Sequence, residues 1–229
     1  MKLRQIRAIL LLLFFISCNQ KKIDNNDSKL SENDKYENKI STQNISVNEL
    51  PKELTFKGNF IKATKLKDEI GNQIVLLTQT EETQSEKIKF IEHEFDKSIY
   101  VYNFLLNNTS NKYELNWKIQ DFEKNCDFDL IIGFLDNTNL FTDLNNNGIT
   151  EIWSMYQKGC VSDVSSLEMK IIMYEGENKH TIRGNSLIDF GNSKFGGEYK
   201  IDDNFLKSHP KILNFAKRMW KDNYIQKFE

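Results

Sequence analysis

The residues of this chain with the clearest capacity for chemistry lie between Asp143 and Glu151. In the stretch Asp143-Leu144-Asn145-Asn146-Asn147-Gly148-Ile149-Thr150-Glu151, side chains with oxygen atoms occupy positions 1, 3, 5 and 9, and glycine occupies position 6. Ca²⁺ is bound by six to eight oxygen atoms, and a glycine at the sixth position permits the sharp turn that wraps the chain round the ion. We therefore expect calcium ligands from the side chains of Asp143, Asn145, Asn147 and Glu151 and from the backbone carbonyl of Ile149.

This stretch differs from an EF-hand loop beyond its first half. Position 12 is Ser154 instead of glutamate, and the flanking residues are typical of strands. The stretch more closely resembles the Asp-x-Asn-x-Asn-Gly-x-x-Glu calcium loops between strands of adhesion-type and secreted β-proteins. Only Asp143 and Glu151 carry full charges, which predicts weak binding, on the order of 10⁻⁴ to 10⁻³ M. Asp163 could add a charge if a disulfide at Cys160 brings it near the loop. The alternative is a β-turn that holds no metal, since Asn and Gly favour turns.

Two cysteines, Cys126 and Cys160, enclose this stretch. An even pair of cysteines indicates a disulfide where a chain is exported, and the N-terminal residues described below indicate export. The bond would close a loop of 35 residues and would stabilise the fold by roughly 3–4 kcal/mol. The alternative is two free buried thiols or a thiol nucleophile, but neither cysteine has a recognisable base beside it in the sequence.

No other catalytic signature accompanies the stretch. His93, His180 and His209 are scattered and lack the spacing of metal ligands. The sequence has no Gly-x-Ser-x-Gly elbow and no glycine-rich phosphate loop after a strand. A glycosidase needs two carboxylates several ångströms apart, and four aspartates could supply such a pair: Asp127, Asp129, Asp136 and Asp163. Three aromatic residues could stack on sugar rings, although aromatic residues on strands more often belong to a core: Trp117, Trp153 and Tyr156.

The composition excludes several classes of protein. The chain has 229 residues, with 31 basic and 33 acidic side chains. Three of the basic residues lie in the first 17 positions, so the rest of the chain carries a net charge of −5. An acidic chain lacks the basic footprint of a nucleic-acid-binding protein, so we expect no nucleic-acid partner. After residue 17 no apolar run approaches the roughly 20 residues of a membrane-spanning helix.

The N-terminus has the features of an exported, lipid-anchored protein. Three basic residues precede an apolar stretch from Ala8 to Ile16, and Ser17 and Cys18 follow. This resembles the lipobox of bacterial lipoproteins, with Phe15 in place of the usual Leu. The resemblance implies cleavage after residue 17 and acylation of Cys18, and two or three acyl chains hold a protein stably on a membrane. We expect a location in the cell envelope, at the outer membrane, with the membrane face left open; the alternative is an ordinary secretory signal.

The elements that must position these residues begin after a polar segment. Residues 18–50 are predicted to be a lipid anchor and a flexible tether, because their apolar residues are isolated among Asn, Lys, Asp, Glu and Ser. From residue 51 onward, short apolar runs alternate with turn residues at intervals of about 10 to 15. The expected strands are 59–64, 74–78, 87–92, 99–106, 113–122, 128–134, 152–156 and 169–174, with hairpin turns at Gly71-Asn72 and at 107–111.

The C-terminus has a different pattern. Pro210 can open a helix, and Ile212, Leu213, Phe215, Ala216, Met219 and Trp220 recur at helical spacing. The intervals between strands are too short for helical crossovers. We therefore predict a mainly β (α+β) domain over residues 51–229: an antiparallel sheet or sandwich with one C-terminal helix packed on it.

Several segments together resemble one known family. They are residues 100–104, 117–122, 141–153, 159–165, 170–176 and 182–184. This set, within residues 95–190, is similar to a family of Bacteroidota lipoproteins that are labelled surface polysaccharide biosynthesis proteins; Ser166 stands where a proline is expected. The resemblance implies a role in making or displaying lipopolysaccharide or capsule and assigns no catalytic residue.

These features predict a non-enzymatic envelope lipoprotein that supports surface polysaccharide assembly or display. Its expected partners are the membrane, through the lipid anchor, and an envelope glycan or an envelope protein. The expected cofactor is a structural Ca²⁺ ion. The alternatives are a lipid-anchored structural or adhesion module and a glycan hydrolase that depends on a carboxylate pair.

Overall fold

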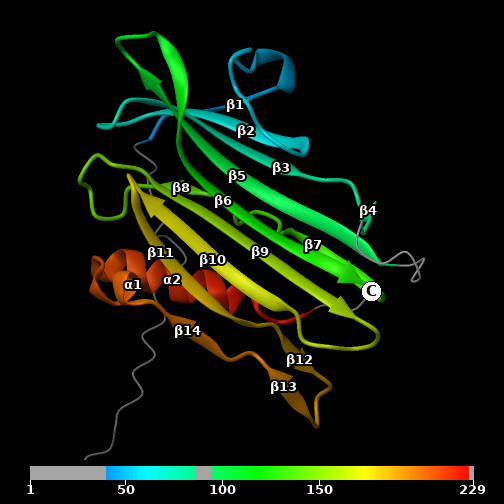
Figure 1. Ribbon diagram of the computed structural model, residues 1–229. Helices are drawn as coiled ribbons and strands as arrows, with labels where there is room; N and C mark the ends of the chain where they lie inside the picture. The colour runs from blue at the N-terminus through cyan, green and yellow to red at the C-terminus, as the bar shows by residue number, and fades with distance from the viewer. Residues whose placement is uncertain (1–39, 86–93, 227–229) are drawn as a thin grey trace, which may run out of the picture. The chain divides into compact units, whose positions relative to one another are not determined.

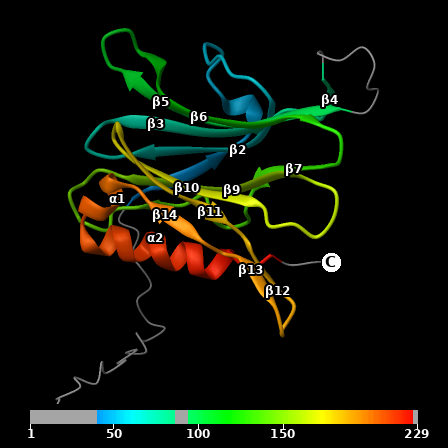
Figure 2. The same cartoon turned by 60° about the horizontal axis from the view of Figure 1, so that its bottom comes forward.

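The strands of the described residues form two antiparallel sheets that face each other, with helices on the outer side of one of them (Figures 1 and 2). The computed structural model describes residues 40–85 and 94–226, which belong to one compact unit of the chain, Tyr36–Glu229. Within these described residues, no helix has the length and apolar character needed to span a bilayer.

The first sheet has six strands in the order β1-β2-β3-β5-β4, and β6 pairs with the other edge of β5. Their bounds are β1 Thr42–Ile45, β2 Asn59–Lys67, β3 Asn72–Gln79, β4 Thr83–Gln84, β5 Phe95–Asn107 and β6 Lys112–Cys126. Both predicted hairpins are present, as β2–β3 and β5–β6. Turn chemistry explains them, because Gly71 and Asn111 adopt positive φ, which Gly and Asn tolerate well.

The second sheet has six strands in the order β14-β11-β10-β9-β7, with β8 also paired to β9. Their bounds are β7 Asp129–Phe134, β8 Phe141–Thr142, β9 Glu151–Val161, β10 Glu168–Glu175, β11 Asn178–Asn185 and β14 Tyr199–Ile201. A separate hairpin joins β12 Leu187–Asp189 to β13 Lys194–Gly196. The helices α1 Asp203–Lys207 and α2 Pro210–Asn223 follow β14. A short 3₁₀ turn, η1 Val47–Glu49, lies between β1 and β2.

The main core lies between the two sheets. The first sheet contributes residues such as Val75, Val101 and Trp117, and the second contributes residues such as Ile152 and Ile172. Alternate residues of each strand face this core because side chains alternate across a strand. The mainly β prediction is therefore confirmed, as a sandwich of two packed sheets.

Each sheet is also covered on its outer face. Phe56 and other residues of the segment 50–60 pack on the outer face of the first sheet. Helix α2 packs on the outer face of the second sheet through Ile212, Ala216, Met219 and Trp220. Figure 2 shows the resulting order of layers, with α2 beneath the second sheet. The predicted C-terminal helix is confirmed, and the short helix α1, which the sequence pattern did not reveal, precedes it.

The N-terminal boundary of the ordered unit differs from the prediction. The tether was expected to extend to residue 50, but residues 42–45 form β1 and pair with residues 63–66 of β2. The reason is that an edge strand gains stability from backbone hydrogen bonds, so one buried apolar side chain, Ile45, is sufficient. The predicted signal peptide 1–17, the lipidation site Cys18, the tether up to residue 39 and the predicted strand 87–92 lie outside the described residues.

The predicted disulfide between Cys126 and Cys160 is present, with a Cα–Cα distance of 5.5 Å. It joins the end of β6 in the first sheet to β9 in the second sheet. The bond therefore connects the two sheets covalently at one end of the sandwich.

Candidate functional site

The Asp143 loop, residues 143–151, connects β8 to β9 and is held by its own side chains. The two carboxylate oxygens of Asp143 accept hydrogen bonds from the backbone N–H groups of Asn147 (3.0 Å) and Gly148 (3.1 Å). The side-chain oxygen of Asn145 accepts from the N–H of Asn147 (3.2 Å), and that of Asn147 accepts from the N–H of Ile149 (2.8 Å). The oxygens that were predicted to be ligands thus shape the loop.

The loop makes the predicted sharp turn and is fastened to the first sheet. Asn146 and Gly148 adopt φ values of 57° and 82°, a region that Gly enters without steric cost. The carbonyl of Gly148 accepts a hydrogen bond from the N–H of Glu69 (3.0 Å). The carboxylate of Asp68 accepts one from the N–H of Thr150 (3.0 Å). These bonds hold the loop against the β2–β3 turn.

Glu151, which was expected to close a calcium site, is turned into the protein and is fully buried. Its carboxylate accepts hydrogen bonds from the hydroxyl of Thr142 (2.7 Å) and from the N–H of Leu144 (2.9 Å). Burial raises the pKa of this carboxyl group, and the nearby carboxylates of Glu175 and Asp143 add to the increase. Glu151 therefore fixes the base of the loop.

A carboxylate that the sequence did not single out, Glu175, stands beside the loop. One of its oxygens accepts hydrogen bonds from the side-chain amides of Asn145 (2.6 Å) and Asn147 (2.7 Å). Glu175 ends β10 and lies directly opposite Glu151 on β9. Only the register of these two strands reveals this neighbour. Within the described residues, no group of three or more His, Cys, Asp and Glu side chains is arranged to hold a metal ion.

The prediction that Asp163 could join the loop is wrong. Glu151 begins β9 and Asp163 lies beyond its last residue, Val161. Ten steps along a strand separate the two ends by about 33 Å. The disulfide lies at that same distant end, so it does not bring Asp163 to the loop.

Other residues that the sequence offered for chemistry have structural positions. Trp117, Trp153 and Tyr156 are buried, with exposed fractions of 8%, 1% and 1%, so they belong to the core and form no sugar platform. His180 is buried beside Phe205. The ring of His209 accepts a hydrogen bond from the N–H of Lys211 at the start of α2 (3.3 Å). His93 lies outside the described residues. Asp127, Asp129 and Asp163 are exposed.

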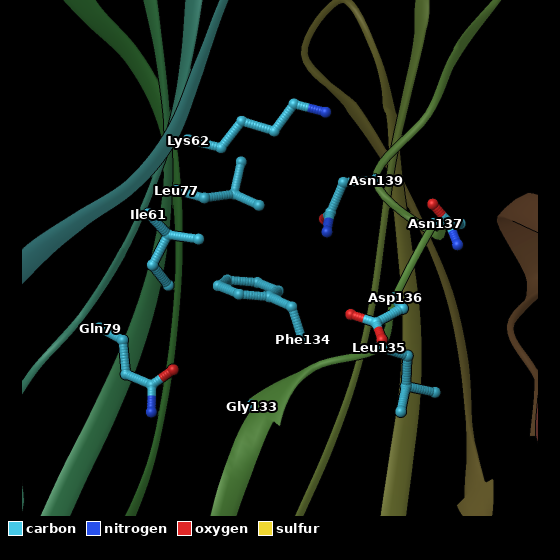
Figure 3. A pocket seen from close by; sticks show the side chains of 10 residues that line it. All are labelled: Ile61, Lys62, Leu77, Gln79, Gly133, Phe134, Leu135, Asp136, Asn137 and Asn139. Atoms are coloured by element: carbon cyan, nitrogen blue, oxygen red, sulfur yellow. The ribbon is translucent and has the colours of Figure 1, made fainter. Parts of the chain in front are cut away.

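A pocket of about 310 Å³, here the inter-sheet pocket, opens between the first sheet and the end of β7 (Figure 3). That volume is at the small end of the range for ligand pockets, roughly 300–1,000 Å³. Its lining residues are Ile61, Lys62, Leu77, Gln79, Gly133, Phe134, Leu135, Asp136, Asn137 and Asn139. Figure 3 shows Asp136 and Asn139 directed into the space beside the ring of Phe134, with Lys62 at its upper end, whereas Leu135 points away.

The pocket combines an apolar floor with polar groups on its walls. Leu77 and the ring of Phe134 form the apolar part, and Phe134 is held by edge-on contact with Tyr156. The side-chain oxygen of Asn139 is buried and has no hydrogen-bond partner in the part of the chain that the structure describes. Buried polar atoms are nearly always hydrogen-bonded.

Local features of both sheets create this pocket. The β2–β3 register shifts between Phe60 and Lys62, so Ile61 bulges outward and is 46% exposed. On the other side, the chain leaves β7 through Asn137, which has a positive φ. The hydroxyl of Thr138 then donates a hydrogen bond to the carbonyl of Leu135 (2.7 Å). The sequence analysis ended a strand at residue 134 but could not show that β2 and β3 lie across from this end.

Comparison with family models, with curated proteins and with solved structures gives no match to this chain. The resemblance to surface polysaccharide biosynthesis lipoproteins therefore stays a prediction, and the function is argued from the residues.

Proposed function

We propose that this chain is a lipid-anchored, non-enzymatic protein of the bacterial cell envelope that holds a surface glycan in the inter-sheet pocket. In this role it supports the assembly or display of lipopolysaccharide or capsule. The observation that carries the proposal is a pocket that combines an apolar floor of Leu77 and Phe134 with the polar side chains of Gln79, Asp136 and Asn139.

The chemistry of the pocket suits a sugar. A sugar ring has C–H groups on its faces and hydroxyl groups round its edge. Phe134 and Leu77 offer contacts for the C–H groups. Gln79, Asp136 and Asn139 offer hydrogen-bond acceptors, and the amides also donate. Specific pockets share this division into an apolar lining and a few placed polar groups.

Two features support a location in the envelope. Cys18 stands at the end of an apolar N-terminal stretch, where the lipobox resemblance implies acylation. Cys126 and Cys160 form a disulfide, and such bonds persist in oxidising compartments outside the cytosol. Together they favour an exported protein held on a membrane.

The pocket favours binding over hydrolysis. A glycosidase uses two carboxyl groups on either side of the bond that it breaks. Among the residues that line the inter-sheet pocket, Asp136 alone carries a carboxyl group. The pocket can therefore orient a sugar but lacks the acid and base pair for this reaction.

We also propose that Ca²⁺ stiffens the Asp143 loop, with Glu175 in the role that the sequence suggested for Glu151. Asp143, Asn145, Asn147, Glu175 and the carbonyl of Ile149 would supply oxygen ligands, which Ca²⁺ prefers. The two asparagine amides converge on Glu175 through their nitrogens. Turning these amides over would present their oxygens to the ion but would break the hydrogen bonds that those oxygens accept from the N–H groups of Asn147 and Ile149, so calcium binding requires the loop to rearrange.

The test is the surface polysaccharide profile of a strain that lacks the gene, run on a gel beside the wild type. We expect a lost or shortened ladder that the wild-type gene restores. The variant Asp136→Ala/Asn139→Leu should fail to restore it. The control Asp203→Ala/Asn214→Leu makes the same two exchanges at exposed positions of the helices and should restore it fully. Immunoblots must show equal amounts of both variants.

Two outcomes would contradict the proposal. An unchanged ladder in the deletion strain would remove the glycan role. Full restoration by Asp136→Ala/Asn139→Leu would show that the inter-sheet pocket is not where the glycan binds.

A further inference from the structure

The inner face of the second sheet continues beyond the first sheet at β11 and β14. There, three cations lie side by side on adjacent strands: Lys170 on β10 is opposite Arg183 on β11, and Arg183 is opposite Lys200 on β14. Directly opposite residues of antiparallel strands point to the same face, and like charges at such positions destabilise a sheet. We call Lys170, Arg183 and Lys200 the basic row.

The carboxylates of Asp121 and Glu168, which lie near the basic row, already pair with Lys170 and with other donors. Asp121 accepts hydrogen bonds from Lys170 (2.6 Å) and from the hydroxyl of Tyr156 (2.9 Å). Glu168 forms ion pairs with Lys170 (2.8 Å) and Lys158 (3.5 Å). Burial would raise the pKa of Asp121, but the hydrogen bonds from Lys170 and Tyr156 outweigh it and lower that pKa. These contacts neutralise Lys170 but not the rest of the row.

Arg183 and Lys200 form no ion pair with any residue in the ranges 40–85 and 94–226. Lys179 lies four residues before Arg183 on β11 and so points to the same face. Its pKa is lowered by partial burial and then by the positive charges of Arg183 and Lys170. Asp121 and Asp202 oppose this decrease, so the charges of Arg183 and Lys170 act on the pKa of Lys179 in addition to its burial.

Space for a ligand exists on both sides of Arg183. A hollow of about 380 Å³ is lined by Asp121, Tyr156, Lys170, Lys179 and Arg183, among others. A second hollow, of about 320 Å³, is lined by residues that include Arg183, Tyr199 and Lys200. The carboxylates of Glu168 and Glu198 also line it; Glu168 is paired with lysines, and Glu198 accepts a hydrogen bond from the amide of Asn185 (2.6 Å). Arg183 is common to both, so its guanidinium group can reach a ligand in either hollow.

We propose that the basic row is a binding site for an oxyanion, the carboxylate or phosphate group of a ligand, distinct from the inter-sheet pocket. The planar guanidinium group of Arg183 can bind two oxygens of such a group at once. Lys200 and Lys179 contribute positive charge on either side. The bound anion relieves the repulsion between Arg183 and the neighbouring lysines. Without the anion, this repulsion lowers the stability of the fold.

The test is the thermal stability of the full chain in phosphate, compared with chloride at equal ionic strength. Phosphate at ten times its Kd should raise the Tm of the wild type by roughly 3–6 °C. In Arg183→Gln/Lys200→Gln the affinity for phosphate should fall about tenfold or more, because hydrogen bonds between charged groups are lost. The control Lys211→Gln/Lys217→Gln removes two exposed positive charges from α2 and should respond as the wild type does.

A second readout depends on the row and not on the ligand. In chloride alone, Arg183→Gln should melt at a higher temperature than the wild type, because it removes the repulsion from Lys170 and Lys200. Equal responses of the wild type and of Arg183→Gln/Lys200→Gln to phosphate and to the two further probes described below would overturn the proposal. A lower Tm of Arg183→Gln in chloride would also count against it.

The source of the oxyanion is identified by three probes: inorganic phosphate, glycerol phosphate as a lipid headgroup mimic, and an oligogalacturonate as an acidic glycan. Any probe whose binding weakens in Arg183→Gln/Lys200→Gln, and not in the α2 control, supports the site and names its source. Failure of all three overturns the site. The inter-sheet pocket is unaltered in these variants, so glycan proposals for that pocket stand or fall separately.

Discussion

The substitution Asn139→Leu separates the stability of the inter-sheet pocket from its function. The side-chain oxygen of Asn139 is buried without a hydrogen bond in the described part of the chain. An unsatisfied buried polar atom costs about 1–3 kcal/mol. Leucine has a similar shape and would pack near Leu77 and Phe134, which line the same pocket. We therefore expect Asn139→Leu to increase the free energy of unfolding of the ligand-free protein by about 1–3 kcal/mol.

The assay is equilibrium unfolding in urea, followed by glycan binding. With an m-value of about 2 kcal/mol per molar urea, the midpoint should rise by about 0.5–1.5 M. Binding of the surface glycan should be lost, because leucine offers no acceptor to a sugar hydroxyl. The control Asn214→Leu, at an exposed position of α2, should stay within about 0.5 kcal/mol of the wild type. A destabilised Asn139→Leu protein, or one that binds glycan normally, would refute the reasoning.

Three further predictions concern the disulfide, a buried histidine and the Asp143 loop. Replacing Cys126 and Cys160 by serine should lower the free energy of unfolding by roughly 3–4 kcal/mol in urea titrations, since the bond closes a long loop; a loss below about 1 kcal/mol would contradict this. Burial lowers the pKa of the His180 imidazole from 6.5. As the pH falls, this imidazole is therefore protonated in the unfolded chain before it is protonated in the folded protein, and the free energy of unfolding should decrease below about pH 6.5. His180→Phe should flatten that fall in melting curves recorded from pH 8 to 5, and an unchanged slope would count against it. CaCl₂ at about 10 mM should raise the Tm of the wild type by a few degrees, and Asp143→Asn or Glu175→Gln should abolish the increase; an equal response to MgCl₂ would indicate no specific calcium site.

The elements with strong local patterns were predictable from the sequence. The β2–β3 and β5–β6 hairpins follow from β-rich runs on either side of Gly71 and Asn111, which take the positive φ that each turn needs. Helix α2 begins at Pro210, as its periodicity and the proline indicated. The disulfide followed from counting cysteines in an exported chain. In each case the information lies in a few neighbouring residues or in residue type.

The elements that depend on distant pairing were not predictable. Strand β1 has one buried apolar residue, Ile45, and is an ordered strand because β2 offers it a free edge. Glu175 reaches the Asp143 loop only through the register that places it opposite Glu151. The inter-sheet pocket joins Lys62 to Asn139, which are far apart along the chain. Such neighbours are set by sheet order and register, which a single sequence does not display.

The two proposed binding sites have a common cause in the sideways offset of the sheets. Where the sheets overlap, inward positions such as Val101 and Ile172 are apolar, because water is excluded there. At one edge β2 and β3 face the end of β7, and at the other β11 and β14 extend past β6. Inward positions at these edges keep access to water, so Lys62 and Arg183 can occupy them without the full cost of burying a charge. The same sandwich therefore has a small pocket with an apolar floor at one edge and a cationic surface at the other.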